Sequence, residues 1–235
     1  MRLAGVHCHI GSQVWNLTSY ARAMQIVVGV VAAASAQIGA ALGELNIGGG
    51  LGIAYHAGDA APTIREYATV VRQAFDDACA GAGLDPRPRL MVEPGRSIAG
   101  PAGLTLYRVG TIKNVPSVRT YVAVDGGMSD NPRPVTYGAR YEAFLPTRAD
   151  AERPFVATVA GKHCEQGDLL VRDAALPDGV AVGDVLAMPA TGGYAYSMAS
   201  NYNRVPRPAV VFVAGGSARV VVRRESLDDL LRLDQ

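Results

Sequence analysis

The sequence has 235 residues with a formal net charge of +1, and 49% of its residues are hydrophobic. A chain of this length can bury a sizeable core, and the absence of any Lys/Arg run argues against a nucleic-acid-binding surface or a polybasic membrane patch. The three cysteines, Cys8, Cys79 and Cys164, form no CxxC pair and no secretory signal opens the sequence, so we expect a cytoplasmic protein.

The first hundred residues alternate between short apolar runs and helical patterns. This order predicts strands at residues 3–9, 45–47 and 89–92 and helices at residues 17–41 and 63–82. Thr63 and Glu66 have the spacing of a capping box. Residues 24–42 carry no charge over a membrane-compatible length, but interruptions by Gln, Ser, Gly and Ala favour a helix packed on a sheet, and we predict no membrane partner. The repeated strand, loop and helix are typical of parallel βα units.

From about Leu104 the chain consists of short apolar or alternating runs separated by Gly, Pro and Asp. This pattern predicts antiparallel β structure, a sandwich or a barrel. The only helix predicted in this part spans residues 227–231. The sequence therefore predicts two domains, residues 1–104 with α/β structure and residues 105–235 with all-β structure.

A polar or glycine-rich segment follows each of the first three predicted strands: HCHIGSQ, IGGGLG and EPGRS. Because the C-terminal ends of parallel strands meet at one edge, we expect these segments to form one site, although three βα units cannot close a barrel. The triple glycine fits neither common nucleotide fingerprint, but its N–H groups suit a phosphate, which Arg96 can also hold. Glu93 precedes Arg96 in the same segment. A carboxylate for the pyridine nitrogen together with groups that bind the phosphate is what pyridoxal phosphate requires.

His7 and His9 share one face of the first predicted strand, and Cys8 faces the other way. With the second His-Cys pair at His163 and Cys164, this spacing allows a zinc or iron site, and a buried histidine held by hydrogen bonds is the alternative. No carboxylate lies at ligand spacing and a Gly-Ser turn follows, so we favour an anion and predict no metal.

Three runs of the second part are more polar than core strands: VDGGMSDNPRPVTY, GKHCEQGD and TGGYAYSMASNYN. The first contains Arg133 and Tyr137, and the second places Cys164 beside Glu165. Each run alone has a plain structural explanation, such as a turn or a small buried cysteine.

Taken together, these runs resemble, in order and spacing, the pyridoxal-phosphate-dependent decarboxylases that act on diaminopimelate and ornithine. The CE pair and the RPVTY run are more similar to the members that decarboxylate meso-diaminopimelate to L-lysine and CO2. The resemblance implies an amino-acid decarboxylase with a (β/α)8 barrel followed by a β-sandwich domain, working as a homodimer with shared sites. A sibling acting on another basic amino acid or a carboxylated polyamine is the alternative, as is a non-catalytic remnant that binds the cofactor.

The resemblance also implies the site residues. It assigns pyridoxal 5′-phosphate to His9, Ser12, Gly49, Gly50, Glu93, Gly95, Arg96 and Tyr194. It assigns the amino-acid substrate to Arg96, Arg133, Tyr137, Glu165 and Tyr194. Of these, His9 would stack on the cofactor ring and Glu93 would pair with the pyridine nitrogen. The resemblance implies His9 and Cys164 as the catalytic residues, with Cys164 as the proton donor, supplied together with Glu165 by the partner subunit.

One departure from the family is large. In this family the lysine that forms the Schiff base lies on an early barrel strand. The only two lysines of this sequence are Lys113, in a β-rich run, and Lys162, beside the His-Cys pair, and neither lies in that motif. We therefore expect the chain to be the C-terminal portion of a longer decarboxylase and to be inactive alone. A smaller departure is Gln166, where the family commonly has serine.

Overall fold

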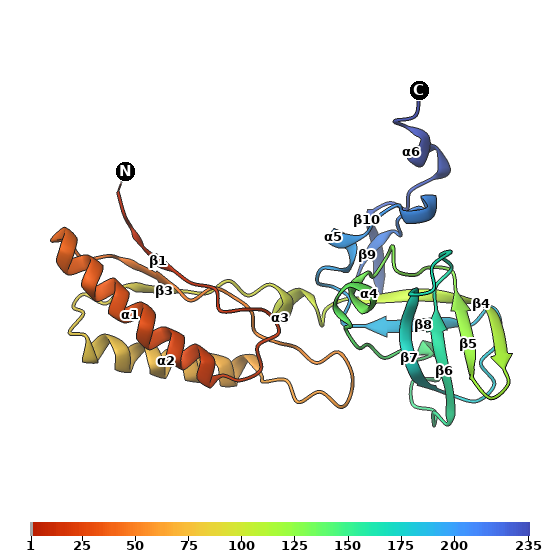
Figure 1. Cartoon of the computed structure of the whole chain (residues 1–235), viewed down its shortest axis with the longest axis horizontal. Coiled ribbons are helices and arrows are strands. Elements are labelled where there is room, and N and C mark those ends of the chain that lie inside the picture. Colours follow the sequence, from red (N-terminus) through yellow and green to blue (C-terminus); the bar gives the residue numbers. More distant parts are fainter. Residues whose placement is uncertain (1) are drawn as a thin grey trace. The chain divides into compact units, whose positions relative to one another are not determined.

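The computed structural model describes residues 2–235, which divide into two compact units. The first unit comprises residues 2–54 and 58–101, and the second comprises residues 55–57 and 102–235. Figure 1 shows the elements of both. The identification of residues 1–104 and 105–235 with a cofactor-binding barrel and a β-sandwich stays a prediction.

The first unit contains a parallel sheet whose strand order is β1-β2-β3. Its elements are β1 (Gly5–His7), α1 (Thr18–Ile38), β2 (Glu44–Asn46), α2 (Ile64–Gly81), β3 (Arg89–Met91) and α3 (Arg96–Ala99). Helices α1 and α2 pack together on the same side of the sheet (Figure 1). The predicted βα units are therefore confirmed, with strands somewhat shorter than expected.

The core of this unit forms because apolar residues recur at helical spacing on α1. They are Tyr20, Met24, Val27, Val28 and Val31, and all five are buried. They pack with Leu45 and Ile47 of the middle strand region and with Val71, Phe75 and Cys79 of α2. Because side chains alternate along a strand, the intervening Glu44 and Asn46 face away from the helices.

The ends of the two long helices follow their sequence signals. Thr63 Oγ1 accepts from the Glu66 N–H at 3.1 Å and Glu66 Oε2 accepts from the Thr63 N–H at 2.7 Å, which confirms the capping box. Helix α1 ends at Gly39, which adopts a left-handed conformation with φ of 68°. By length and composition α1 could cross a membrane, a test that buried core helices also pass, and one of its faces lies in the core here.

The second unit contains a five-stranded sheet in the order β7-β6-β5-β4-β8 and a β9-β10 ribbon. Its strands are β4 (Leu104–Val115), β5 (Arg119–Val124), β6 (Phe155–Ala160), β7 (Leu169–Leu176), β8 (Val185–Pro189), β9 (Val210–Ala214) and β10 (Ser217–Val222). All pairings are antiparallel except β5 with β6, which is parallel. The purely antiparallel prediction is wrong there, because the long connection across residues 125–154 returns the chain to the same end of the sheet.

Short helices interrupt the β structure where none was predicted. They are α4 (Arg133–Tyr137), α5 (Ala195–Met198) and the 3₁₀ turns η1 (Pro146–Arg148) and η2 (Tyr202–Arg204). Pro132 precedes helix α4, and Gly138, which follows it, has a left-handed conformation with φ of 61°. A proline favours the start of a helix and a left-handed glycine favours its end, so the two residues limit α4 to about one turn. A turn this short leaves no apolar periodicity in the sequence. The predicted C-terminal helix is confirmed as α6 (Leu227–Leu231).

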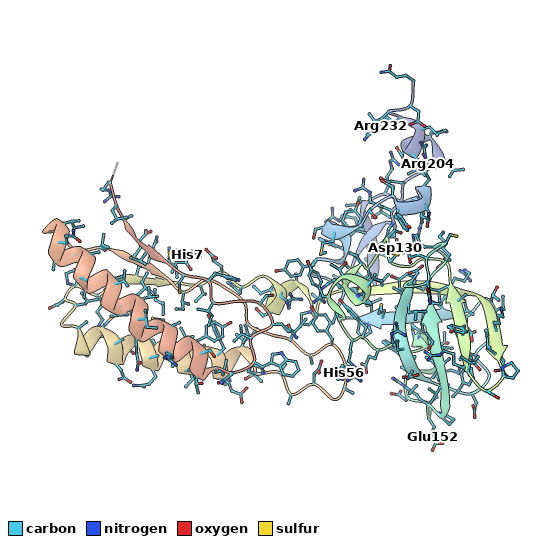
Figure 2. The ribbon with its side chains drawn as sticks, in the orientation of Figure 1. His7, His56, Asp130, Glu152, Arg204 and Arg232 are labelled. Carbon is cyan, nitrogen blue, oxygen red and sulfur yellow. The ribbon has the colours of Figure 1, made fainter. Side chains whose placement is uncertain are left out.

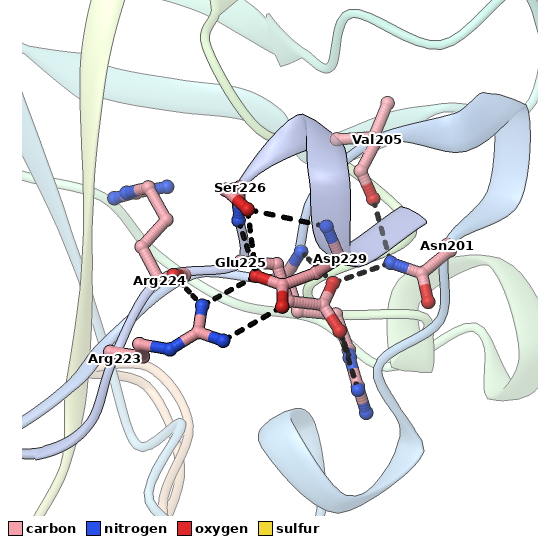
Figure 3. A network of polar contacts seen from close by, with 8 residues as sticks. Asn201, Val205, Arg223, Arg224, Glu225, Ser226 and Asp229 are labelled. Atoms are coloured by element: carbon pink, nitrogen blue, oxygen red, sulfur yellow. Dashed lines mark hydrogen bonds and ion pairs between the residues drawn. The ribbon is translucent and has the colours of Figure 1, made fainter. Parts of the chain in front are cut away.

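A polar network anchors the C-terminal segment of this unit (Figure 3). Glu225 accepts hydrogen bonds from the Asn201 amide at 2.6 Å and from the Arg207 guanidinium at 2.6 and 2.8 Å. Asp229 caps α6 at Ser226 and pairs with Arg223. The pKa of Glu225 is lowered to about 2, and the hydrogen bonds from the Arg207 side chain are the largest cause.

This pKa predicts an acid-dependent contribution to stability. A carboxylate whose pKa is depressed on folding stabilises the fold above its unfolded value of 4.5, and the effect is lost as pH falls through about 2. Because Arg207 is partly solvent-exposed, we expect Glu225→Gln to cost about 1 kcal/mol at pH 7. The wild-type advantage should disappear near pH 2 in urea unfolding.

The control is Glu152→Gln, the same chemical change on an exposed loop (Figure 2). It should leave the pH dependence of unfolding as in the wild type. A difference between Glu225→Gln and the wild type that stays constant from pH 7 to pH 2 would contradict the assigned role of the ion pair.

Candidate functional site

The face of the parallel sheet that α1 and α2 leave uncovered carries polar side chains. His7 and His9 are both exposed on it, whereas Cys8 packs against the core, as the strand alternation predicts. His7 is labelled in Figure 2 on the strand side of this unit. The cross-strand register aligns His7 with Asn46, so the polar residues form rows across the sheet.

Glu93 lies at the end of β3 and is held by two of these residues. Its Oε1 accepts from the Asn46 amide at 2.8 Å, and its Oε2 lies 3.2 Å from His7 Nε2. The hydrogen bond with His7 contributes most to lowering the pKa of the Glu93 carboxyl, and Asn46 adds to it. An ionised and oriented carboxylate suits a protonated ring nitrogen.

The glycine run after β2 makes close backbone contacts with the loops after β1 and β3. A Cβ added to Gly49 would lie 2.3 Å from the Glu93 carbonyl oxygen, and one on Gly50 would lie 2.1 Å from the Gly11 carbonyl oxygen. Gly50 also has a positive φ of 97°. The structure thus brings together the three loops that the sequence predicts to form one site.

Side chains reinforce this junction. The Gly49 N–H donates to His9 Nδ1 at 3.3 Å, and the Tyr20 hydroxyl donates to the Gly49 carbonyl at 3.2 Å. Burial raises the pKa of Tyr20 to about 12, with a smaller contribution from Tyr67, so the hydroxyl remains a donor. His9 is therefore tied to the glycine loop by a hydrogen bond.

Arg96 and Ser12 lie together at the start of α3. Gly95 precedes this helix, and the Arg96 guanidinium donates to Ser12 Oγ at 2.9 Å. An arginine fork, a hydroxyl and a glycine-lined backbone are the groups that bind phosphate in proteins. The residues of the first unit therefore fit pyridoxal phosphate, with Glu93 for the ring nitrogen and Arg96 and Ser12 for the phosphate.

Arg133 occupies an aromatic cage in the second unit. Its side chain is buried, its Nη1 donates to the Tyr141 hydroxyl at 2.7 Å, and its guanidinium lies 4.7 Å from the Tyr55 ring centroid. Burial raises the pKa of Tyr141 and the nearby Arg133 opposes this shift. Tyr137, one helical turn away on α4, is exposed. Sequence analysis missed Tyr55 and Tyr141, for which no local pattern gave a signal.

The Cys164–Glu165 loop presents both side chains to solvent. The exposure rules out a small buried cysteine at this position. Glu165 Oε2 accepts from the Tyr202 hydroxyl at 3.4 Å. Tyr194, half-exposed at the start of α5, adopts a φ of 69°, which is uncommon for a residue with a Cβ and is found at functional sites.

Among residues 2–235, no group of three or more His, Cys, Asp or Glu side chains is arranged to hold a metal ion. His163, considered as a ligand in the sequence, lies buried with its Nδ1 2.8 Å from Asp168 Oδ2.

The comparisons with known proteins agree with the fit to pyridoxal phosphate. Residues 1–100 match the family model of the pyridoxal-binding domain of pyridoxal-dependent decarboxylases. The chain is 46% identical over 242 residues to the diaminopimelate decarboxylase of Mycobacterium tuberculosis, covering 100% of this chain and 54% of that protein. It is 48% identical over 230 residues to the diaminopimelate decarboxylase of Synechocystis, and this match covers 98% of this chain and 48% of that protein.

Solved structures show the same relationship. The diaminopimelate decarboxylase from M. jannaschii aligns with a TM-score of 0.90 at 34% identity, covering 99% of this chain and 52% of that one. The chain spans about half the length of the relatives that it matches. The resemblance seen in the sequence motifs is confirmed: residues 1–100 match the pyridoxal-binding domain of the pyridoxal-dependent decarboxylases, and nearly the whole chain aligns with diaminopimelate decarboxylases.

Proposed function

We propose that this chain works in a diaminopimelate decarboxylase, which converts meso-2,6-diaminopimelate to L-lysine and CO2 in the last step of lysine biosynthesis. The observation that carries the proposal is the match along the whole chain to enzymes of that name at 43–48% identity. A related enzyme from Helicobacter pylori, with a TM-score of 0.84 and 32% identity, was solved with L-lysine. Lysine is the product that the proposed reaction forms.

The cofactor of this proposal is pyridoxal 5′-phosphate. When bound, it supplies an electron sink for the electron pair that remains when CO2 leaves. The residues proposed to hold it are His9, Ser12, Gly49, Gly50, Glu93, Gly95, Arg96 and Tyr194. Glu93, oriented by His7 and Asn46, would hold a proton at the ring nitrogen, and His9 would stack on the ring.

The substrate carries an amino-acid group at each end, which explains the charged residues of the second unit. A distal carboxylate calls for an arginine and a distal ammonium calls for a carboxylate. Arg133 suits the first role because Tyr55 and Tyr141 fix its guanidinium, and Glu165 suits the second. Arg96, Tyr137 and Tyr194 are the remaining proposed contacts.

Cys164 is proposed to deliver the proton that replaces CO2. A thiol at the face of the cofactor can donate from Sγ to carbon, and the exposure of this side chain leaves its sulfur accessible. We further propose a cytoplasmic homodimer in which the Cys164–Glu165 loop of one subunit serves the site of its partner.

The test is a substrate panel on the complete protein loaded with pyridoxal phosphate. We expect CO2 release and equimolar L-lysine from meso-diaminopimelate, with kcat/KM at least about 100-fold above that for ornithine, arginine or a carboxylated polyamine. Preference for one of those compounds would assign the protein to a sibling activity. Cofactor binding without turnover of any of them would overturn the enzymatic proposal.

A further inference from the structure

We propose that His163 and Asp168 are positioning residues, which fix the Cys164–Glu165 loop in the conformation it needs. The catalytic consequence rests on the proposed function, whereas the structural effect on the loop does not. The loop lies between two buried anchors, since His163 and Asp168 are each at most 8% exposed while Cys164, Glu165 and Gln166 are exposed.

Asp168 holds the loop through both its carboxylate and its backbone. Oδ2 accepts from the His163 N–H at 3.0 Å and lies 2.8 Å from His163 Nδ1, and Oδ1 accepts from the Met128 N–H at 2.7 Å. The Asp168 N–H donates to the Glu165 carbonyl at 3.1 Å. One buried carboxylate therefore closes the loop on itself and ties it to the turn that contains Met128.

Two glycines make room for this carboxylate. A Cβ on Gly127 would lie 2.4 Å from Asp168 Oδ2, and a Cβ on Gly161 would lie 2.0 Å from the same atom. Neither glycine has a positive φ that would itself require glycine. Close approach to Asp168 is thus the physical reason for glycine at both positions.

His163 connects the anchor to the acidic residue of the loop. Its ring stacks on Tyr202 with centroids 5.9 Å apart and planes 15° apart, and the Tyr202 hydroxyl donates to Glu165 Oε2 at 3.4 Å. His163 Nε2 is buried and has no hydrogen-bond partner among residues 2–235. Only Nδ1 of the ring is therefore used for a hydrogen bond, and it is used for Asp168.

This asymmetry provides a matched pair of variants. In His163→Asn the amide nitrogen takes the place of Nδ1 and keeps the donor to Asp168, while the unused Nε2 is lost. In His163→Leu no donor remains, and the buried carboxylate loses one partner. Both variants lose the stacking on Tyr202, and asparagine differs from leucine, which has nearly the same shape, by the amide that supplies the donor to Asp168.

The first measurement needs no catalytic activity. The rate of Cys164 alkylation by iodoacetamide, followed by peptide mass spectrometry in the complete protein, reports whether the loop is held. We expect Cys164 to be alkylated at least about threefold faster in His163→Leu than in the wild type, and within about twofold of the wild-type rate in His163→Asn, which keeps the donor to Asp168 but not the stacking. Equal rates in all three proteins would overturn the proposal.

The second measurement is the steady-state kinetics of meso-diaminopimelate decarboxylation. Since displacement of a reacting group by about 1 Å costs up to about 100-fold, we expect kcat to fall about tenfold or more in His163→Leu and to be recovered to within about threefold in His163→Asn. Equal losses in both variants would assign His163 to packing alone and contradict the proposal. An inactive wild type with the expected alkylation difference would refute the proposed function and leave the positioning role supported.

Discussion

Replacement of Glu93 by glutamine is expected to lower kcat for meso-diaminopimelate by at least about 100-fold in the complete protein. Hydrogen bonds from His7, which contributes most, and from Asn46 lower the pKa of this carboxyl, and a negatively charged acceptor would keep the ring nitrogen of the proposed cofactor protonated. Glutamine preserves the shape of the side chain but carries no negative charge. Steady-state kinetics, together with the dissociation constant for pyridoxal phosphate, would measure the effect.

The matched control is Glu44→Gln on the neighbouring strand β2. Glu44 faces the same uncovered side of the sheet, where it pairs with Arg89 at 2.7 Å, one row away from His7. We expect its kcat to stay within about threefold of the wild type. A Glu93→Gln enzyme with near-normal kcat would contradict the role of Glu93, and equal losses in both variants would indicate a general effect of charge on this sheet face.

The elements that could be predicted are those whose sequence signal is local. The α1 periodicity, the Thr63 capping box and the residues 227–231 helix each depend on neighbours a few positions apart. The parallel pairing of β5 with β6 could not be predicted, because an apolar strand carries no mark of its partner or direction. The one-turn helices α4 and α5 were not predicted, because a helix of four or five residues is too short to show an apolar periodicity.

The candidate site divides in the same way. Motifs at strand ends pointed to Glu93 and the glycine loop, because topology alone brings the ends of parallel strands together. The contact between the Tyr55 ring and Arg133 joins positions that are 78 residues apart in the sequence. No local pattern could predict it, because only the tertiary structure brings the two residues together. His163 was considered as a metal ligand in the sequence, whereas the structure buries its ring with Nδ1 against Asp168.

Gly49→Ala is expected to destabilise the fold by about 2 kcal/mol or more, although the change adds a single methyl group. Its backbone has no positive φ, so the cost is not a conformational preference for glycine. The added Cβ would lie 2.3 Å from the Glu93 carbonyl oxygen, and a backbone atom cannot rotate away as a flexible side chain would. Urea unfolding would measure the loss.

Gly29→Ala in α1 is the control for this effect. Nothing lies within 4 Å of a Cβ at Gly29, and alanine favours a helix over glycine by about 0.5–1 kcal/mol, so this variant should be more stable than the wild type. A stable Gly49→Ala protein would show that the loops after β2 and β3 can separate at little cost. Glu93 carries both the crowded carbonyl and the carboxylate that we propose for the ring nitrogen, so we expect relief of the clash to displace that carboxylate. The variant should therefore lose kcat even at temperatures where it remains folded.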